Sequence, residues 1–421
     1  MKKSYSTLLV LLLATAAANA EAWVEFRGGG KAGNTSAINL PVEWDTKNGV
    51  VWKTSSASGW SSPVIGAGKV YLTMTLPGAD ADSFELGVAA YNLETGEQIF
   101  LKKTFEIKSK FAPKKHKKNG YASPTPVFHD GRLFVHFGHL GTACLSAEGE
   151  ILWVNRDLDF QPVHGNGGSP ELVGDALIFS CDASKAPSVV ALNKETGKLM
   201  WRHLRDSGAK RKFSFSTPLV ITVKGKQQII CPGSGEVSAL DPETGKEIWK
   251  ATYDQGYSVI PRPVYGHGMV FIATGYDRPK VMAIRVDGSG DVTQSHVVWT
   301  ARKSAPNTPS LLLVGEELYM VSDGGIGSCL DARTGAVHWN ERLGGTYSAS
   351  PLFGDGRIYF QSEGGECVVI NAGKTFQVVA KNDLEEKAFA SYAVVGSDFI
   401  IRTETKLYRI RKGISGPRSP L

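Results

Sequence analysis

Three histidines and one aspartate are the residues whose types could bind a metal ion or exchange protons: His136, His139, His164 and Asp182. Imidazole nitrogens and carboxylate oxygens bind zinc, and the same groups serve as general acids and bases in hydrolases and lyases. Histidines beside glycine-rich loops more often form structural hydrogen bonds. We therefore expect no metal here, and a hydrolase or lyase that uses His136, His164 and Asp182 is the weakest alternative.

Other catalytic signatures are missing from the 421-residue sequence. It contains no Gly-x-Ser-x-Gly, no His-Glu-x-x-His, no phosphate-binding loop and no dinucleotide-binding glycine pattern. No two carboxylates have a spacing that forces them together, so a glycosidase mechanism has no support. The cysteines include no adjacent pair and no Cys-x-x-Cys, and we expect buried thiols rather than disulfides: Cys144, Cys181, Cys231, Cys329 and Cys367.

A repeated turn indicates which elements must position the polar residues. An aromatic residue stands four positions after a glycine in five places, at Gly96, Gly149, Gly197, Gly245 and Gly335. Most of these turns begin with Asp or Asn, whose side chain accepts hydrogen bonds from nearby backbone, and the glycine takes a positive φ. Each turn predicts a β-hairpin whose second strand opens with an aromatic side chain that can pack against a neighbouring sheet.

A proline followed by a β-rich run precedes these turns and defines the repeat. It recurs every 42 to 63 residues, at Pro63, Pro126, Pro170, Pro218, Pro263, Pro309 and Pro351, with a proline-free version near Ala393. Units of about 40–45 residues with four short strands are typical of propeller blades. The 47 glycines and 20 prolines also fit an all-β chain. The sequence therefore predicts an all-β fold, a single eight-bladed β-propeller of four-stranded blades.

The two ends of the repeat region are incomplete in complementary ways. The last unit has three expected strands, within 390–395, 399–403 and 407–410, and no fourth strand, whereas residues 50–54 resemble a fourth strand without a blade. We predict that this N-terminal strand completes the last blade and closes the ring. The expected boundaries are a signal peptide at 1–20, an extended segment at 21–49, the propeller at 50–412 and a tail at 413–421.

Propeller geometry assigns the loops to two faces. Turns between strands one and two, and between three and four, contain little besides hairpin residues, as at 65–68 and 395–398. Loops between strands two and three, and crossings between blades, carry the polar side chains on the opposite face. Convergent polar groups at a concave mouth indicate a binding site, although such groups could also only satisfy each other and buried backbone. The candidate ligand-binding residues are His136, His164, Asn166, Asp182, Ser214, Ser216, Tyr257, Arg262, Asn307, Asp323, Tyr347, Glu363, Arg402 and Glu404.

An insertion rich in lysine lies between the first and second blades, on this polar face. Residues 102–118 contain eight lysines and His116. We interpret the insertion as a solvated, mobile loop, with contact to an anion or polyanion as the alternative. Few aromatic residues are interleaved with the lysines, so single-stranded nucleic acid is not an expected partner.

The first twenty residues have the pattern of a cleavable signal peptide. Lys2 and Lys3 precede an apolar run from Leu8 to Leu13, and small residues at 18–20 form a cleavage site. The apolar run is too short to anchor the protein permanently in a bilayer. We therefore expect an exported protein, periplasmic or secreted, which is monomeric and has no transmembrane segment after cleavage. Its net charge of +6 is no nucleic-acid signature.

The Thr-Gly-x-x-x-Trp turns resemble those of the pyrroloquinoline quinone (PQQ) repeat family, the eight-bladed quinoprotein-type propellers. Longer stretches are similar to an exported subgroup from planctomycete- and verrucomicrobia-type bacteria: 121–126, 163–170, 212–218, 257–263 and 347–351. The similarity covers about residues 22–412. It is specific for the fold and says little about the activity.

The resemblance implies two kinds of function. The family's dehydrogenases bind PQQ between a tryptophan and a ring of two adjacent cysteines, with calcium and a catalytic aspartate, but this chain has no adjacent cysteines. The family's barrel-assembly scaffolds of the bacterial outer membrane bind proteins without a cofactor. We therefore expect a non-catalytic binding or scaffold protein without a cofactor, which binds an unknown protein or extracellular ligand at the polar channel face. The alternative is a PQQ- and calcium-dependent dehydrogenase that oxidises alcohols or sugars.

Overall fold

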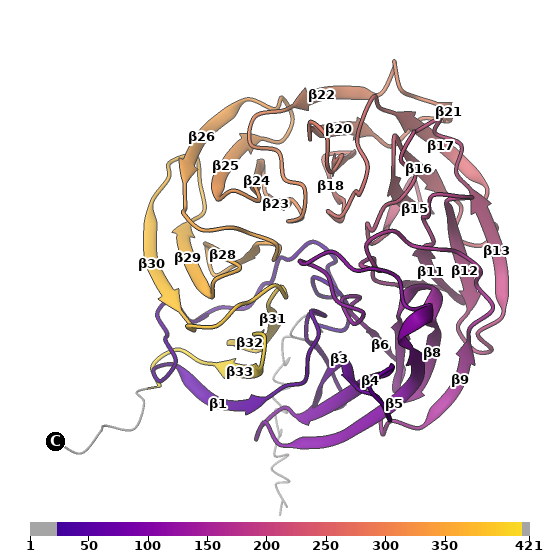
Figure 1. Ribbon diagram of the computed structural model, residues 1–421. Coiled ribbons are helices and arrows are strands. Elements are labelled where there is room, and N and C mark those ends of the chain that lie inside the picture. Colours follow the sequence, from indigo (N-terminus) through magenta and orange to yellow (C-terminus); the bar gives the residue numbers. More distant parts are fainter. Residues whose placement is uncertain (1–22, 415–421) are drawn as a thin grey trace, which may run out of the picture.

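Short β-runs separated by glycine turns fold into eight mainly antiparallel sheets, which form a ring around a central channel (Figure 1). The computed structural model describes residues 23–414. In the first seven blades the first strand lies next to the channel and the fourth lies outermost, except in blade 4, where one further short strand pairs outside the fourth. The predicted eight-bladed all-β propeller is therefore confirmed. The predicted signal peptide at 1–20 lies outside the described residues.

The first four blades follow the chain in order. Blade 1 contains β2 (Val64–Gly66), β3 (Lys69–Pro77), β4 (Ser83–Asn92) and β5 (Gln98–Lys108). Blade 2 contains β6 (Val127–His129), β7 (Arg132–His136), β8 (Thr142–Ser146) and β9 (Ile151–Asn155). Blade 3 contains β10 (Glu171–Val173), β11 (Ala176–Ser180), β12 (Ser188–Asn193) and β13 (Leu199–Leu204). Blade 4 contains β14 (Leu219–Val223), β15 (Lys226–Gly233), β16 (Glu236–Leu240) and β17 (Glu247–Thr252), and β21 (Gly290–Asp291) joins β17 in parallel.

The remaining blades repeat the same arrangement. Blade 5 contains β18 (Val264–Gly266), β19 (Met269–Ala273), β20 (Val281–Arg285) and β22 (Val297–Ala301). Blade 6 contains β23 (Leu312–Val314), β24 (Glu317–Val321), β25 (Ile326–Asp331) and β26 (Val337–Arg342). Blade 7 contains β27 (Leu352–Gly354), β28 (Arg357–Gln361), β29 (Glu366–Asn371) and β30 (Val378–Asp383). Blade 8 contains β31 (Ala393–Val395), β32 (Asp398–Arg402) and β33 (Lys406–Ile410).

The ring closes as the incomplete ends predict. Strand β1 (Val50–Ser55) pairs antiparallel with β33, placing Lys53 opposite Tyr408 and Ser55 opposite Lys406. It is the fourth strand of blade 8. The segment from 23 to 414 includes two short 3-10 helices, η1 (Ser109–Phe111) and η2 (Gly138–Leu140), and none of its helices could span a membrane.

The repeated turns dock each blade onto the next. The Asn193 side chain accepts the N–H groups of residues 195 and 196, and Gly197 has φ +69°. The Trp153 ring of the preceding blade covers Gly197, and its indole N–H donates to the Lys194 carbonyl at 2.8 Å. A Cβ at Gly197 would lie 2.4 Å from the Trp153 ring, so the turn needs glycine for its φ and for this contact. The same packing joins Trp52 to Gly96, Trp201 to Gly245 and Trp299 to Gly335.

The apolar core lies largely between blades. Between blades 2 and 3, for example, Phe134 and Cys144 pack with Leu177, Phe179 and Val190. All five cysteines are buried and free, as expected. Strand β5 extends to Lys108, so the first part of the lysine-rich insertion is strand rather than loop.

Candidate functional site

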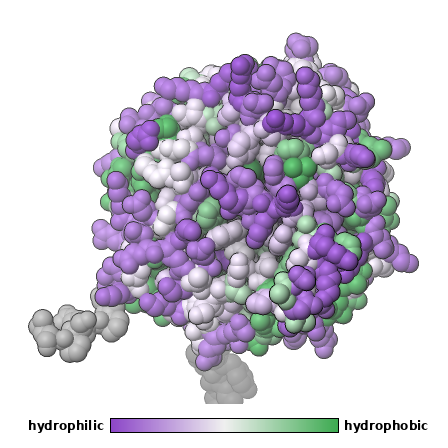
Figure 2. All heavy atoms as spheres, in the orientation of Figure 1, coloured by the Kyte–Doolittle hydropathy of each residue, from purple (hydrophilic) through white to green (hydrophobic). Residues whose placement is uncertain are grey.

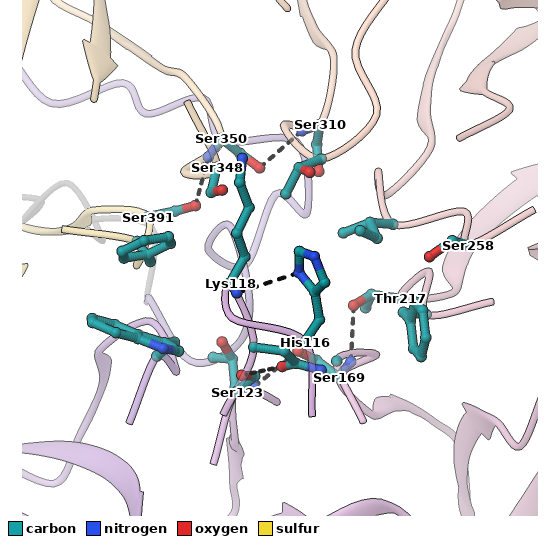
Figure 3. Close-up of a pocket in the computed structure, with 18 of the residues that line it drawn as sticks. His116, Lys118, Ser123, Ser169, Thr217, Ser258, Ser310, Ser348, Ser350 and Ser391 are labelled. Atoms are coloured by element: carbon teal, nitrogen blue, oxygen red, sulfur yellow. Dashed lines mark hydrogen bonds between the residues drawn. The ribbon is translucent and has the colours of Figure 1, made fainter. Parts of the chain in front are cut away.

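The central channel contains a cavity of about 340 Å³ on the face formed by the blade crossings. Its walls come from crossings and inner loops of all eight blades, on the face that sequence reasoning assigns to the polar loops. Aromatic side chains line part of it, and Trp60 and Phe389 lie with ring centroids 4.5 Å apart. Hydroxyl side chains form most of the remaining wall (Figure 3).

Seven of these hydroxyls form a belt around the cavity, with one residue from each blade except blade 5. Each belt oxygen accepts the backbone N–H of the equivalent residue one blade earlier, at 2.9–3.1 Å. Six donors are themselves belt residues, and the seventh is Arg262 of blade 5. The belt residues, all buried, are Ser62, Thr125, Ser169, Thr217, Ser310, Ser350 and Ser391.

The belt hydroxyls retain unused donors. None of the seven donates a hydrogen bond to another group within residues 23–414. The backbone N–H occupies one lone pair of each oxygen, so the hydroxyl hydrogen is available to a ligand in the cavity. Buried polar groups are normally paired, and this ring is therefore suited to a group that offers several acceptors.

The second half of the lysine-rich insertion covers the cavity. Residues 115–119 form a lid that is held on one side by the His164 carbonyl, which accepts from the His116 N–H at 3.2 Å and from the Asn119 side chain at 2.9 Å. On the other side, the Lys118 ammonium lies 2.7 Å from Glu363. Figure 3 shows His116 and Lys118 surrounded by the hydroxyl residues. The interpretation as a solvated loop therefore does not hold for Lys118, which is partly buried.

The opposite end of the channel is closed by the N-terminal segment, residues 23–35. This segment, indigo in Figure 1, crosses the middle of the ring. Its carbonyl groups accept from Ile65 of blade 1 and Phe128 of blade 2, and it pairs with Phe353 of blade 7. Phe26 faces the cavity and forms part of its floor. The predicted extended segment is thus a plug that contacts several blades.

Buried charges hold the plug in place. The Arg262 guanidinium, whose own blade lacks a belt hydroxyl, donates to the carboxylate of Glu171 and to the Phe26 carbonyl at 2.5 Å, and lies 3.4 Å from Glu25. Lys31 pairs with Glu171 and lies 3.7 Å from Glu25. Burial raises the pKa of Glu25 to about 8, and the negative charge of Glu171 adds to the rise.

Arg27 belongs to the same cluster, and its guanidinium reaches backbone carbonyls of blades 6 and 7. Its guanidinium donates to the Leu311 carbonyl of blade 6 at 2.6 Å and to the Pro351 carbonyl at 3.4 Å. Burial lowers the pKa of Arg27 to about 9, and the positive charge of Arg262 lowers it further.

Four of the predicted ligand-binding residues lie at the cavity or its rim. His164 and Tyr257 line the cavity. Asp323 and Glu363 stand at the rim, where Asp323 accepts from the Thr308 hydroxyl at 2.7 Å and Glu363 from the Ser348 hydroxyl at 2.6 Å.

The candidate metal ligands from the sequence do not form a metal-binding group: His136, His139, His164 and Asp182. His136 is buried in blade 2, where its Nδ1 lies 2.8 Å from the Thr142 hydroxyl and its ring 3.9 Å from that of Phe179. Burial lowers the pKa of His136 to about 3. Asp182 pairs with Arg205 at 2.8 Å. Residues 23–414 contain no group of three or more His, Cys, Asp or Glu that could hold a metal ion.

The other predicted residues do not line the cavity, and most of them serve the fold. The Arg402 guanidinium donates to three backbone carbonyls and to the Ser61 hydroxyl. The Ser214 and Ser216 hydroxyls donate to the carbonyls of Val259 and Pro261. The remaining positions are Asn166 and Tyr347, which are buried, Asn307, whose N–H donates to Asp323, and Glu404, which lies at the surface 3.9 Å from Lys387.

Sequence reasoning missed the belt, the lid and the aromatic wall. The belt has a sequence signal, because the belt Ser or Thr itself directly precedes the blade-first proline in five of the blades, at Pro63, Pro126, Pro170, Pro218 and Pro351. The lid has no such signal, since Lys118 reaches Glu363 only through closure of the ring.

Comparison with known proteins places the chain in a family. The family model described as "Outer membrane protein assembly factor BamB", which represents PQQ-like repeats, matches residues 85–327 and 296–383, well over half of the chain. The chain belongs to this family of PQQ-like repeat propellers. Solved structures of similar fold include BamB from Moraxella catarrhalis, with a TM-score of 0.59 and 13% identity over 86% of this chain and 98% of that one. A quinohemoprotein alcohol dehydrogenase from Pseudomonas putida has a TM-score of 0.64 and 10% identity, covering 95% of this chain and 82% of that one.

Curated relatives match shorter stretches of the PQQ-like propeller. An uncharacterized protein of Rickettsia conorii is 23% identical over 236 residues, which are 53% of this chain and 52% of that protein. The quinoprotein ethanol dehydrogenase of Pseudomonas aeruginosa is 32% identical over 148 residues, 31% of this chain and 23% of the dehydrogenase. The chain thus spans about half of the first relative and a quarter of the second.

The cofactors of the family's dehydrogenases do not fit this cavity. Calcium takes six to eight oxygen ligands, commonly including carboxylates. No Asp or Glu lines the cavity, and the rim carboxylates Asp323 and Glu363 already accept hydrogen bonds from protein donors. The sequence also lacks the adjacent cysteines that the family's dehydrogenases place against the quinone.

Proposed function

We propose that this PQQ-like propeller is an exported, non-catalytic binding or scaffold protein that takes its ligand or partner at the lidded end of the channel. The observation that carries the proposal is the belt of seven buried hydroxyls, which face the cavity with unused donors. Mostly hydrophilic residues cover the face of the ring in Figure 2, which suits contact with a polar ligand or partner.

The candidate catalytic groups also favour binding over catalysis. His136 is neutral and buried against Phe179, and Asp182 is paired with Arg205, so neither reaches a substrate in the channel. His116, His164 and Lys118 do reach the cavity, but the carboxylate beside Lys118, Glu363, is engaged by that lysine and by the Thr346 and Ser348 hydroxyls. Acid–base catalysis needs a second group within hydrogen-bond reach of the reacting atoms.

Export is part of the proposal and rests on the residue pattern of positions 1–20. The same holds for membership of the exported subgroup, which rests on the motifs at 121–126 and 163–170. A fusion of the full chain to a reporter enzyme that is active only outside the cytoplasm tests export. Reporter activity is expected, and its absence would contradict this part.

A cavity-filling variant tests the site. Gly167 lines the cavity, and a Cβ there would make only ordinary contact with Phe215, at 3.4 Å. Gly167→Phe should fill the cavity without breaking the belt. Gly324→Phe is the matched control, because a Cβ at Gly324 meets open space.

The readout is thermal unfolding of the exported chain with panels of organic acids, sugars and short peptides. A ligand that binds the folded state raises the melting temperature. Stabilisation of the wild type and Gly324→Phe, but not of Gly167→Phe, supports the cavity as the site. Equal stabilisation of Gly167→Phe, or no stabilisation by any of the panels, overturns it.

The second candidate function is a PQQ- and calcium-dependent dehydrogenase. It is favoured by the 148-residue match to a quinoprotein ethanol dehydrogenase. Reconstitution with PQQ and calcium decides it: an absorbance change together with dye reduction by alcohols or aldose sugars would establish the activity. The absence of both signals would dismiss this candidate function.

A further inference from the structure

We propose that the cavity binds a small organic carboxylate, whose oxygens accept from the hydroxyl belt while the lid residue Lys118 pairs with its charge. This inference rests on the proposed function, because it names the class of ligand that the same cavity takes.

The belt supplies donors rather than acceptors. Each of its seven oxygens accepts a backbone N–H, and none of its hydroxyls donates to the rest of residues 23–414. A carboxylate has two oxygens with about four acceptor positions and no donor, so it matches this ring. Hydrogen bonds to an ionised acceptor are about twice as strong as neutral ones. A sugar would bring donors for which the belt has fewer free acceptors.

The charges around the cavity also favour an anion. No Asp or Glu lines it, whereas Lys118 and His116 stand above it. Below the floor lies the plug cluster, where Arg262 donates to the carbonyl of the cavity residue Phe26. This cluster holds three cationic side chains and two carboxyl groups, and the raised pKa of Glu25 keeps one carboxyl largely protonated near pH 7. The plug side therefore presents a net positive charge to the cavity, whereas on the lid side the charge of Lys118 is balanced by the rim carboxylate Glu363.

The walls select an organic anion over an inorganic one. The aromatic rings of Phe26, Trp60, Phe215 and Phe389 line the cavity beside the hydroxyls. Its volume of about 340 Å³ lies at the lower end of the range of small-molecule pockets, about 300–1,000 Å³. Sulfate or phosphate would leave these aromatic surfaces without contact, whereas a carboxylate with a flat apolar body would cover them.

The lid can admit such a ligand if Lys118 exchanges the carboxylate of Glu363 for that of the ligand. Lys118 pairs with Glu363, and its side chain is 25% exposed. Partly exposed ion pairs contribute at most about 1 kcal/mol, so the ammonium can leave Glu363 at low cost. The other side of the lid stays attached through the backbone contact of His116 with His164.

Calorimetry on the full mature chain tests the inference with four carboxylates: benzoate, phenylacetate, phthalate and succinate. Benzyl alcohol is the neutral match of benzoate, and sulfate is the inorganic control. We expect at least one aromatic carboxylate to bind more than tenfold tighter than benzyl alcohol and sulfate. Lys118→Met should weaken that binding about tenfold or more, whereas Lys117→Met, which removes the same charge from the lid but not from the cavity wall, should change it less than twofold.

Folding of both variants is checked by their melting temperatures, and Gly167→Phe should abolish binding. Failure of all four carboxylates, equal binding of benzyl alcohol, or equal effects of the two lysine substitutions overturns the inference. If neutral ligands bind to the wild type but not to Gly167→Phe, and carboxylates do not bind, the proposed function stands and the ligand class is wrong. If no ligand of any class binds, both fail.

Discussion

The two ends of the channel are built from the same repeat and use their polar groups differently. At the plugged end, Arg27 and Arg262 direct their guanidinium groups to backbone carbonyls of neighbouring blades and to buried carboxylates. At the lidded end, belt residues such as Ser169 and Thr217 accept backbone hydrogen bonds and keep their hydroxyl donors free. Apart from Arg27 Nε, which has no acceptor within residues 23–414, these guanidinium groups are satisfied by the protein and serve the structure, whereas the free belt donors are suited to a ligand.

Blade 5 shows how one substitution in the repeat separates these roles. Its belt position is Arg262 rather than Ser or Thr, and the Thr217 N–H of the preceding blade therefore has no hydroxyl partner in the belt. The guanidinium instead leaves the belt and fastens the plug through Glu171 and Glu25. The belt is therefore interrupted at blade 5, whose Arg262 holds the plug at the opposite end of the channel.

The largest effect is expected from Arg262→Met. It leaves Glu171, whose side chain is fully buried, without one of its two cationic partners. Breaking a buried pair from one side costs about 3–5 kcal/mol, because the remaining charge stays desolvated. Urea unfolding should report a loss of this size, whereas Arg278→Met, on an exposed loop at the lidded face, should stay within about 0.5 kcal/mol of wild type. Similar losses from both variants would refute the contrast between the two ends.

A smaller effect should follow from adding one methyl group to the plug. Gly33 has φ +77°, and a Cβ there would lie 2.6 Å from the Arg27 guanidinium and 3.0 Å from the Pro351 carbonyl. Gly68 has φ +69° and open space around it. Gly68→Ala should cost about 1–2 kcal/mol for the left-handed backbone alone. Gly33→Ala should cost about 1–3 kcal/mol more because of overpacking, and equal melting temperatures for the two variants would argue against a tightly packed plug.

The ring and its faces could be predicted from the sequence because their signals are local or repeated. Gly197 and Trp153 lie in separate copies of one turn motif, and recognising the repeat is enough to pair them. The strand at 50–54 is identified because the last unit lacks a fourth strand. The two loop faces then follow from propeller connectivity.

The roles of single polar residues could not be predicted in the same way. Arg262 and Arg402 lie in polar crossings or inner loops and resemble ligand contacts, yet their partners come from distant segments. Arg262 meets Glu25 237 positions away, and Arg402 meets Ser61 341 positions away. His136 is a core residue because Phe179 of the next blade covers it. No spacing within one repeat shows such contacts, so polarity alone does not separate a ligand contact from a structural bond.

The pH dependence of stability tests the difference between the plugged and lidded ends of the channel at Glu25. Its folded-state pKa of about 8 lies above the ordinary value, so the folded chain holds a proton that the unfolded chain has already released. This contribution is complete below about pH 4.5 and is lost as the pH rises to 8, with a slope of at most about 1.4 kcal/mol per pH unit. Urea unfolding of Glu25→Gln between pH 5 and 9 should show a flatter decline than wild type. Glu404→Gln, at the surface of the lidded end, should keep the wild-type decline; if both variants behave as wild type, the plug cluster does not hold a protonated Glu25.

The smallest effect on stability is expected at the lid. Lys118 and Glu363 are 2.7 Å apart, but their side chains are 25% and 14% exposed, so solvent and salt screen the pair. A double-mutant cycle with Lys118→Met and Glu363→Gln should give a coupling energy below about 1 kcal/mol, which falls as salt is added. The same cycle on Arg262 and Glu171, both fully buried, should give a larger and less salt-dependent value. A strong, salt-insensitive coupling at Lys118 would mean that the lid is fixed like the plug, and a ligand would then have no way to draw Lys118 away from Glu363.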